Sequence, residues 1–266
     1  EVRQAVEKNN YKFHLFKTTG ENDIQKIKEE IDQIQPERVL VVGGDGTVKI
    51  VAEALFHKDL PIAIFPAGSA NGLALNVGIP ENRKQQIEVA MGDHFTNLDV
   101  LQVNDELCLH LSDIGLNAEL IKNYESASIR GKFGYLMQSI PTLVRSKYPY
   151  EYEVEIDGKV YNHKGIMLAI ANCQKYGTGA KINPEGRHDD GKFEIVIFKN
   201  LDITEILGTL REDVKFNPDF AETISTERAI ISCKTPIAFQ IDGEFIENTQ
   251  KIEVKIAEKS LKIAVK

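Results

Sequence analysis

The sequence predicts an α/β domain with a parallel sheet, followed by a mainly antiparallel β-sandwich domain. Residues 13–78 alternate short β-rich runs with helical stretches, the order of a parallel sheet covered by helices. Most segments after Asn97 are typical of short strands separated by Asn-Asp, Asp-Gly and Gly-rich turns. A chain of 266 residues, of which 42% are hydrophobic, can bury two such cores. We therefore expect domains at residues 1–97 and 98–266.

The first domain is expected to consist of successive βα units. We assign strands to residues 13–17, 38–42 and 62–65, and helices to residues 23–34, 48–56 and 82–91. Asn22 or Asp23 can cap the first of these helices, and Pro36 ends it before the next strand. Because the chain starts with Glu1 inside a helical pattern, we expect its natural start to lie upstream.

The second domain is expected to be a sandwich or barrel of short strands. We assign strands to residues 98–103, 107–112, 150–156, 166–171, 193–198, 237–241, 251–256 and 261–265. One helical stretch, residues 129–144, interrupts them. Whether the last strand belongs to the second domain or returns to the first domain is left open.

Composition excludes several classes of protein. The formal net charge is -8 and the sequence pI is near 5.4, which opposes broad adsorption to nucleic acid or to an anionic bilayer. No apolar run approaches the roughly 20 residues of a spanning helix. The three cysteines are far apart and lack metal-ligand spacing, which favours a reducing cytoplasm and predicts neither a disulfide framework nor a zinc site.

A glycine-rich turn follows the strand at residues 38–42. It consists of Gly43, Gly44, Asp45, Gly46 and Thr47, directly before a helix. Glycines let backbone amides approach phosphate oxygens, the helix N-terminus favours anions, and a carboxylate such as Asp45 can reach Mg²⁺. We expect Gly44 to adopt a left-handed conformation. The alternative is a strand-to-helix turn without a ligand.

A second turn of the same kind follows the strand at residues 62–65. It contains Gly68, Ser69 and Asn71 and precedes a short helix. If the two strands are neighbours, both turns open at the carboxyl ends of the sheet, where α/β folds bind ligands. The alternative is that Ser69 only caps the helix.

The order of these and later motifs resembles the diacylglycerol kinase and sphingosine kinase superfamily. GGDGT at residues 43–47 is shared with NAD kinases and phosphofructokinases, whereas residues 64–72 resemble the second nucleotide loop of the lipid kinases. Further similar segments are residues 112–118, 131–136, 172–200 with its Asp-Asp-Gly turn, and 240–244 with its Asp-Gly-Glu. The resemblance implies an NAD kinase/phosphofructokinase-like α/β domain, a β-rich lipid-substrate domain and catalysis in the cleft between them.

The resemblance also implies roles for particular residues. The two glycine turns would bind ATP, with Thr18 near the phosphates and Glu244 near the nucleoside. Asp99 would help to organise Mg²⁺ and water, and Asp242 would be the general base that accepts the proton of a lipid hydroxyl. Without the resemblance, Asp242 and Gly243 are equally typical of a hairpin turn.

Asp190 resembles a residue that binds a structural cation. Oxygen ligands at this position suit Mg²⁺ or Ca²⁺, although Asp-Asp-Gly is also a common surface turn. Three features depart from the family pattern: the first strand with its NPxSG turn is absent, and Gly72 and Asn117 stand where acidic residues are usual.

The resulting expectation is a cytoplasmic, ATP- and Mg²⁺-dependent kinase that phosphorylates a diacylglycerol- or sphingosine-like lipid. Basic and aromatic residues between Arg130 and Tyr148 could touch lipid headgroups at a membrane surface, or the segment could be a helix packed on the sandwich. No nucleic-acid partner is expected, and a homodimer is left open. The alternatives are an NAD kinase-like enzyme with a soluble acceptor and a non-catalytic nucleotide- or lipid-binding module.

Overall fold

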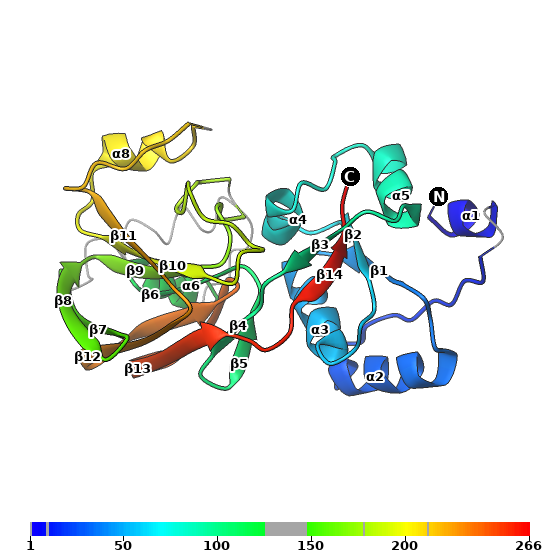
Figure 1. The fold of residues 1–266 in the computed structure, drawn as a ribbon, viewed down its shortest axis with the longest axis horizontal. Coiled ribbons are helices and arrows are strands. Elements are labelled where there is room, and N and C mark those ends of the chain that lie inside the picture. The colour runs from blue at the N-terminus through cyan, green and yellow to red at the C-terminus, as the bar shows by residue number, and fades with distance from the viewer. Residues whose placement is uncertain (1, 9–10, 126–147, 178, 212) are drawn as a thin grey trace. The chain divides into compact units, whose positions relative to one another are not determined.

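The computed structural model describes residues 2–8, 11–125, 148–177, 179–211 and 213–266. The chain forms two compact units (Figure 1). One unit contains Glu1–Leu98 together with Lys259–Lys266, and the other contains Asp99–Glu258. The C-terminal segment, whose position the sequence left open, therefore lies in the first unit.

The first unit is an α/β domain around a four-stranded sheet. Its strand order is β1 (Val39–Gly43), β2 (Ile62–Pro66), β14 (Leu261–Ala264) and β3 (Phe95–Leu98). β2 is parallel to both β1 and β14, and β3 is antiparallel to β14. The parallel pairing confirms that the two glycine turns leave neighbouring strands in the same direction.

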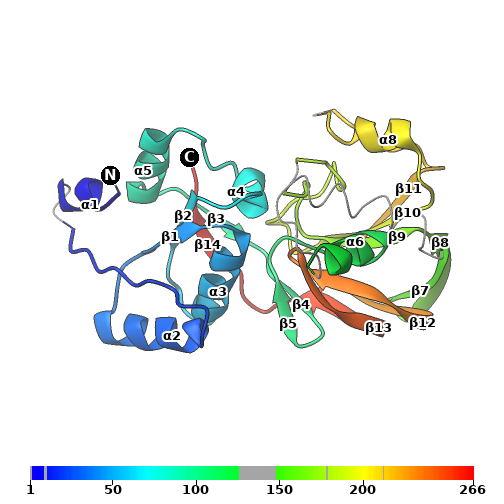
Figure 2. The same cartoon turned by 180° about the vertical axis from the view of Figure 1, so that it is seen from behind.

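Helices cover both faces of this sheet (Figures 1 and 2). α2 (Asp23–Ile34) and α3 (Asp45–Leu55) lie on one face, and α4 (Gly72–Asn76) and α5 (Arg83–Met91) lie on the other. α1 (Val2–Lys8) lies beside α5. The strand β2 is buried along most of its length, as a parallel strand covered on both faces must be.

Two local predictions in this unit are wrong. Residues 13–17 form no strand, although their β-rich composition suggested one. β-propensity alone does not make a strand, because a strand also needs a neighbour to complete its hydrogen bonds. Asn22 is the N-cap residue of α2 but makes no capping bond, and the Asp23 carboxylate instead accepts from the backbone N–H groups of Thr19 and Gly20.

The second unit is an antiparallel β-sandwich. Its main strand path is β11-β10-β9-β6-β12-β13-β4-β5, with β7 and β8 attached through β12. The strands are β4 (Leu101–Val103), β5 (Glu106–Cys108), β6 (Leu111–Gly115), β7 (Tyr150–Ile156), β8 (Lys159–Gly165), β9 (Met167–Ala171), β10 (Phe193–Phe198), β11 (Ala221–Thr226), β12 (Arg228–Ile241) and β13 (Glu244–Ile256).

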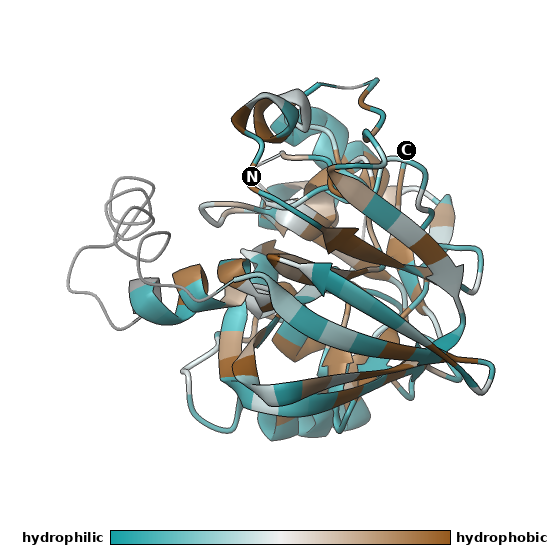
Figure 3. Cartoon of the chain, turned by 90° about the vertical axis from the view of Figure 1, so that its left-hand side faces the viewer, coloured by the Kyte–Doolittle hydropathy of each residue, from teal (hydrophilic) through white to brown (hydrophobic). Residues whose placement is uncertain are grey.

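The long strand β12 turns this sheet back on itself. Its first half pairs with β7 and its last residues pair with β6, with irregular register after Ser232 and after Phe239. Such bulges bend a strand and let it change neighbours. The interior is apolar and includes the fully buried Phe193 and Ile241. Hydrophobic and hydrophilic residues alternate along strands in Figure 3. On β7, for example, buried and exposed residues alternate.

In the described part of the second unit, the helices are α6 (Leu116–Glu125) and α8 (Ile203–Gly208). The helix expected at residues 129–144 and the similar segment at 131–136 lie outside the described residues, as does most of the predicted headgroup-contacting stretch. Among the helices described, none is long and apolar enough to span a bilayer.

Candidate functional site

The two glycine turns of the first unit meet at the ends of β1 and β2. A Cβ atom built on Gly68 would lie 2.5 Å from the Cα of Gly44, so neither residue leaves room for a side chain between the turns. The backbone N–H of Ala67 also donates to the carbonyl of Gly43 at 2.9 Å. Glycine is therefore needed at both positions, because the backbones of the two turns approach each other closely.

The left-handed conformation expected at Gly44 is wrong. Gly44 is the N-cap of α3 with φ -92° and ψ -173°, an extended conformation that any residue can adopt. Glycine is required there because Gly68 is so close. The N–H groups of the first turn of α3 point along the helix axis toward its N-terminal end, a position that favours anions.

Asp45 holds the second turn against the first. Its two carboxylate oxygens accept hydrogen bonds from the backbone N–H groups of Gly72 at 2.9 Å and Leu73 at 3.0 Å. These are the first residues of α4, whose own N-cap, Asn71, makes no side-chain capping bond to the helix. The Asn71 side chain instead bonds the backbone N–H and carbonyl of Gly68. Asp45 thus supplies the cap of α4 from another element.

The remaining predicted residues of the first unit occupy different positions. Gly43, Gly46 and Thr47 belong to the first turn and the start of α3, and Ser69 is exposed in the second turn. Ser69 does not cap α4. Thr18 is exposed in the segment before α2, and no hydrogen bond joins it to either turn among the described residues.

Asp242 occupies a two-residue turn between β12 and β13. Asp242 and Gly243 have φ values of 52° and 88°, and Ile241 faces Glu244 across the hairpin. These positive φ values are those of a type I′ turn, so the hairpin interpretation of this dipeptide is correct for the backbone. Glu244 is exposed at the start of β13.

The Asp242 side chain also makes hydrogen bonds to another segment of the chain, which a turn residue does not need. Its carboxylate accepts hydrogen bonds from the backbone N–H groups of Leu109 at 3.0 Å, His110 at 2.9 Å and Leu111 at 3.3 Å. The backbone N–H of Asp242 donates in turn to the carbonyl of Leu111 at 2.9 Å. A half-buried carboxylate held by successive amides has a fixed orientation, as a group in proton transfer needs.

Asp99 and Asp190 lie close together in the second unit. The Asp99 carboxylate accepts from the backbone N–H of Gly191 at 2.7 Å, and its own N–H donates to the carbonyl of His188. Burial raises the pKa of Asp99, and the negative charges of Asp190 and Asp189 add to this, whereas the Gly191 bond opposes it. The predicted water-organising residue and the predicted cation ligand are thus neighbours.

Asn172 connects Asp99 to the segment that holds Asp242. The sequence included it as the first residue of the similar segment 172–200 but gave it no role. Its side-chain amide donates to the carbonyls of Asp99 and Leu109, each at 2.7 Å. Asn172 is fully buried, and its Oδ1 atom has no hydrogen-bond partner among the described residues. The sequence signal for a functional role of Asn172 was its polar side chain directly after the apolar strand β9.

The described residues contain no group of three or more His, Cys, Asp or Glu side chains suited to a metal ion. A magnesium ion bound with a nucleotide usually keeps several waters and takes one or two protein carboxylates together with phosphate oxygens. Asp45 in the first unit was predicted to reach Mg²⁺, and Asp99 in the second unit was predicted to organise Mg²⁺ and water.

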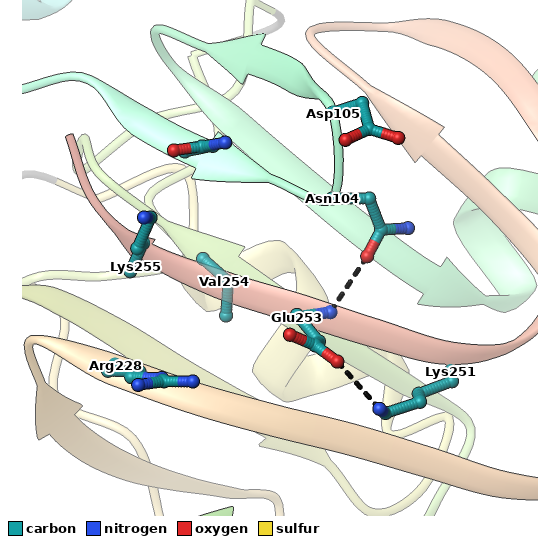
Figure 4. Close-up of a pocket in the computed structure, with 8 residues that line it drawn as sticks. Asn104, Asp105, Arg228, Lys251, Glu253, Val254 and Lys255 are labelled. Atoms are coloured by element: carbon teal, nitrogen blue, oxygen red, sulfur yellow. Dashed lines mark hydrogen bonds and ion pairs between the residues drawn. The ribbon is translucent and has the colours of Figure 1, made fainter.

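A polar hollow of about 570 Å³ in the second unit contains none of the predicted site residues (Figure 4). It lies over β4, β12 and β13, where Lys251 pairs with Glu253 and the backbone N–H of Glu253 donates to the Asn104 side chain. Its lining is charged and exposed, unlike the concave and mostly apolar sites that bind small molecules.

Two family models match the chain. Residues 1–103 match the diacylglycerol kinase catalytic domain, and residues 113–265 match the YegS C-terminal NAD kinase β-sandwich-like domain. Among curated proteins, "Probable lipid kinase YegS-like" from Enterobacter sp. strain 638 is 26% identical, over 91% of this chain and 84% of that protein. "Probable lipid kinase YegS" from Escherichia coli O1:K1 is 27% identical, over 87% of this chain and 79% of that protein.

Solved structures share the fold. A diacylglycerol kinase from Bacillus anthracis has a TM-score of 0.76 at 16% identity, covering 99% of this chain and 91% of that chain. An NAD kinase from Archaeoglobus fulgidus in complex with ATP has a TM-score of 0.56 at 13% identity, and the match covers 99% of this chain and 87% of that chain. At these identities, both likenesses concern the fold alone.

Proposed function

Since this chain belongs to the family that joins a diacylglycerol kinase catalytic domain to a YegS-type C-terminal domain, we propose that it transfers the γ-phosphate of ATP to the hydroxyl of a membrane lipid. The acceptor class is a diacylglycerol- or sphingosine-like alcohol. The observation that carries the proposal is the pair of glycine turns at Gly44 and Gly68, packed backbone to backbone at the ends of two parallel strands.

The glycine turns would bind the phosphates of ATP. Backbone amides at the start of α3, and those of Ser69 and Asn71 in the second turn, are suited to phosphate oxygens, whereas the N–H of Gly68 already donates to the Asn71 side chain. Mg²⁺ carried with ATP would neutralise the charge that develops on the transferred phosphate. Asp45, which already accepts two backbone N–H groups, and Asp99 would hold the waters and the metal through their remaining lone pairs.

Asp242 would accept the proton of the lipid hydroxyl as that oxygen attacks the γ-phosphorus. The amides of Leu109, His110 and Leu111 hold its carboxylate in one orientation. Glu244 would contact the nucleoside, Thr18 would lie near the phosphates, and Asp190 would bind a structural cation beside Asp99. Contact with the membrane would be peripheral.

One observation favours a second candidate. The fold is shared with an NAD kinase solved with ATP, so a soluble nucleotide acceptor is the alternative. The names of the curated relatives, at about a quarter identity over most of the chain, support the lipid.

A product assay distinguishes the candidates. The purified protein is incubated with radiolabelled ATP and Mg²⁺, with detergent-dispersed diacylglycerol, monoacylglycerol or sphingosine, or with NAD. We expect a labelled organic-phase product with one lipid and none with NAD. Labelled NADP would establish the alternative, and ATP binding without transfer to any acceptor would establish a non-catalytic module.

A further inference from the structure

A buried carboxylate with three side-chain donors lies next to the strand end that carries Asp242. Asp113 on β6 is fully buried. Its Oδ2 atom accepts from the Tyr176 hydroxyl, the Asn117 amide and the Gln240 amide, each at 2.6 Å. Its Oδ1 atom has no hydrogen-bond partner among the described residues.

Gln240 connects this cluster to the turn. Its Nε2 atom donates to Asp113, while its Oε1 atom accepts from the backbone N–H of Gly243 at 2.7 Å. The two ends of one amide thus have different partners, and only one orientation of the amide satisfies both. The carbonyl of Gln240 is also held, by the Ser112 hydroxyl at 2.6 Å.

Stability alone does not account for Asp113. Burial raises the pKa of its carboxyl group, although the bonds from Tyr176, Asn117 and Gln240 oppose the rise. A buried ionisable group often stabilises a fold less than an apolar residue of similar size would. What an apolar residue could not provide is an acceptor that selects one orientation of the Gln240 amide.

We propose that Asp113 and Gln240 are positioning residues that act in series: Asp113 orients the Gln240 amide, and Gln240 holds the backbone of Gly243 and with it the turn of Asp242 and Glu244. This inference rests on the proposed function, since the turn carries the proposed base. The amides of residues 109–111 hold the Asp242 carboxylate, and the Gln240 side chain holds the backbone N–H of Gly243.

Hydrogen exchange at Gly243 tests the series without any assay of activity. The protein is labelled with ¹⁵N-glycine, and exchange is measured in Asp113→Leu, Asp113→Asn and Gln240→Leu. The matched control is Glu194→Leu, because Glu194 is also a buried carboxylate that accepts from two side chains, Asn183 and Ser225, on β10 away from the turn.

We expect Gly243 to exchange at least about tenfold faster in Asp113→Leu and Gln240→Leu, the change that corresponds to about 1.4 kcal/mol. Asp113→Asn keeps an acceptor oxygen for the three donors, so its Gly243 exchange should stay near the wild-type rate. Unchanged protection in both leucine variants, or an equal acceleration in Glu194→Leu, would overturn the series.

Kinetics then separate this inference from the proposed function. Gln240→Leu should lower kcat, and it should add no further loss of kcat in an Asp242→Asn background, since both changes act on kcat through one group. An additive loss would contradict the series. If the wild-type protein phosphorylates no lipid, the proposed function fails, while the exchange rates still decide whether Asp113 and Gln240 position the turn.

Discussion

Asp157 and Asp242 show how the surroundings of a residue separate two identical dipeptides. Each is followed by glycine, each has a φ of 52°, and each forms the turn of a β-hairpin. Asp157 is exposed, and no hydrogen bond of its side chain is seen among the described residues. Asp242 instead accepts from the backbone amides of residues 109–111. The pair therefore offers a matched test of the base assignment.

Asp242→Asn should keep the turn, because asparagine also tolerates the left-handed conformation. Its amide oxygen can still accept from His110 and Leu111, whereas the bond from the N–H of Leu109 is lost, so the Tm of the variant is measured together with its turnover. Turnover should fall by roughly 10²–10⁴, the usual cost of losing a positioned acid or base, and the loss should appear in kcat more than in the lipid KM. Asp157→Asn is the control and should retain full turnover. Near-normal turnover of Asp242→Asn on the true acceptor would remove the base role and direct attention to Asp99.

Gly68→Ala tests the close approach of the two glycine turns. The new Cβ would lie 2.5 Å from the Cα of Gly44, so the turns must separate. We expect a loss of about 1–3 kcal/mol in the free energy of unfolding, as for other overpacked sites, together with weaker ATP binding. Gly208→Ala is the control, because a Cβ there meets nothing within 4 Å. Equal ATP affinity and equal Tm in the two variants would contradict the packing argument.

Asp113→Asn should change how stability depends on pH. Burial raises the pKa of Asp113 in the folded state, so ionisation costs more there than in the unfolded chain. The contribution of this group is therefore present below its unfolded pKa of about 3.9 and is lost as pH rises toward the folded value. The Tm of the variant minus that of the wild type should increase from pH 4 to neutral pH. A difference that stays constant with pH would show that the carboxyl group does not titrate in this way.

At the scale of elements, ion pairs join three neighbouring strands of the sandwich. Glu151 on β7 pairs with Lys164 on β8 at 2.9 Å and with Lys234 on β12 at 2.8 Å. Hydrogen bonds and charge attraction from Lys164 and Lys234 lower the pKa of Glu151 to about 2. All three side chains are substantially exposed, so salt will screen this cluster.

Glu151→Gln should therefore cause a small, pH-dependent loss of stability. A lowered carboxyl pKa contributes stability above the unfolded value of about 4.3, and this contribution is lost as pH falls toward the folded pKa. Thermal unfolding should show the wild type above the variant at pH 6, with the difference vanishing near the folded pKa and shrinking in high salt. Glu155→Gln, on the same face of β7 and without an ion pair among the described residues, is the control; the same pH-dependent loss there would contradict the assignment.

Elements with a clear local pattern were predictable. The helix expected at residues 23–34 is α2, which begins at Asp23 and ends at Ile34, because its apolar residues repeat at helical spacing. The strand expected at residues 13–17 is absent, because composition does not supply a neighbouring strand. The group that caps α4 could not be predicted, since the cap comes from Asp45, 27 residues earlier than Gly72.

At the scale of the molecule, the chain leaves the first unit at Leu98 and returns at Lys259. The returning strand β14 lies between β2 and β3, and its residues Leu261, Ile263 and Ala264 are buried. The sheet of the first unit therefore combines three strands that precede Asp99 with one strand from residues 259–266.

Truncation after Glu258 should unfold the first unit, because β2 and β3 lose the strand between them and the core loses these three side chains. The far-UV circular dichroism should lose helical signal, since α1 to α5 all lie in this unit, and any ATP-induced rise in Tm should disappear. Deletion of Lys266 alone is the control. A truncated chain that retains its helical signal and ATP response would show that β14 is dispensable.

Local information in the sequence was sufficient for the fold class, the two glycine turns, the Asp-Gly hairpins and the order of motifs that resembles the lipid kinases. These features depend on periodicity, turn chemistry and short spacings. Each motif is visible within a few residues, and the order of the motifs follows directly from the sequence. The contact of Gly44 with Gly68, the cap from Asp45 to α4, the link through Asn172 and the series from Asp113 to Gly243 were not visible there. Each of these joins residues from different elements, and the partner of a buried polar group is set by which strands and turns the fold brings together.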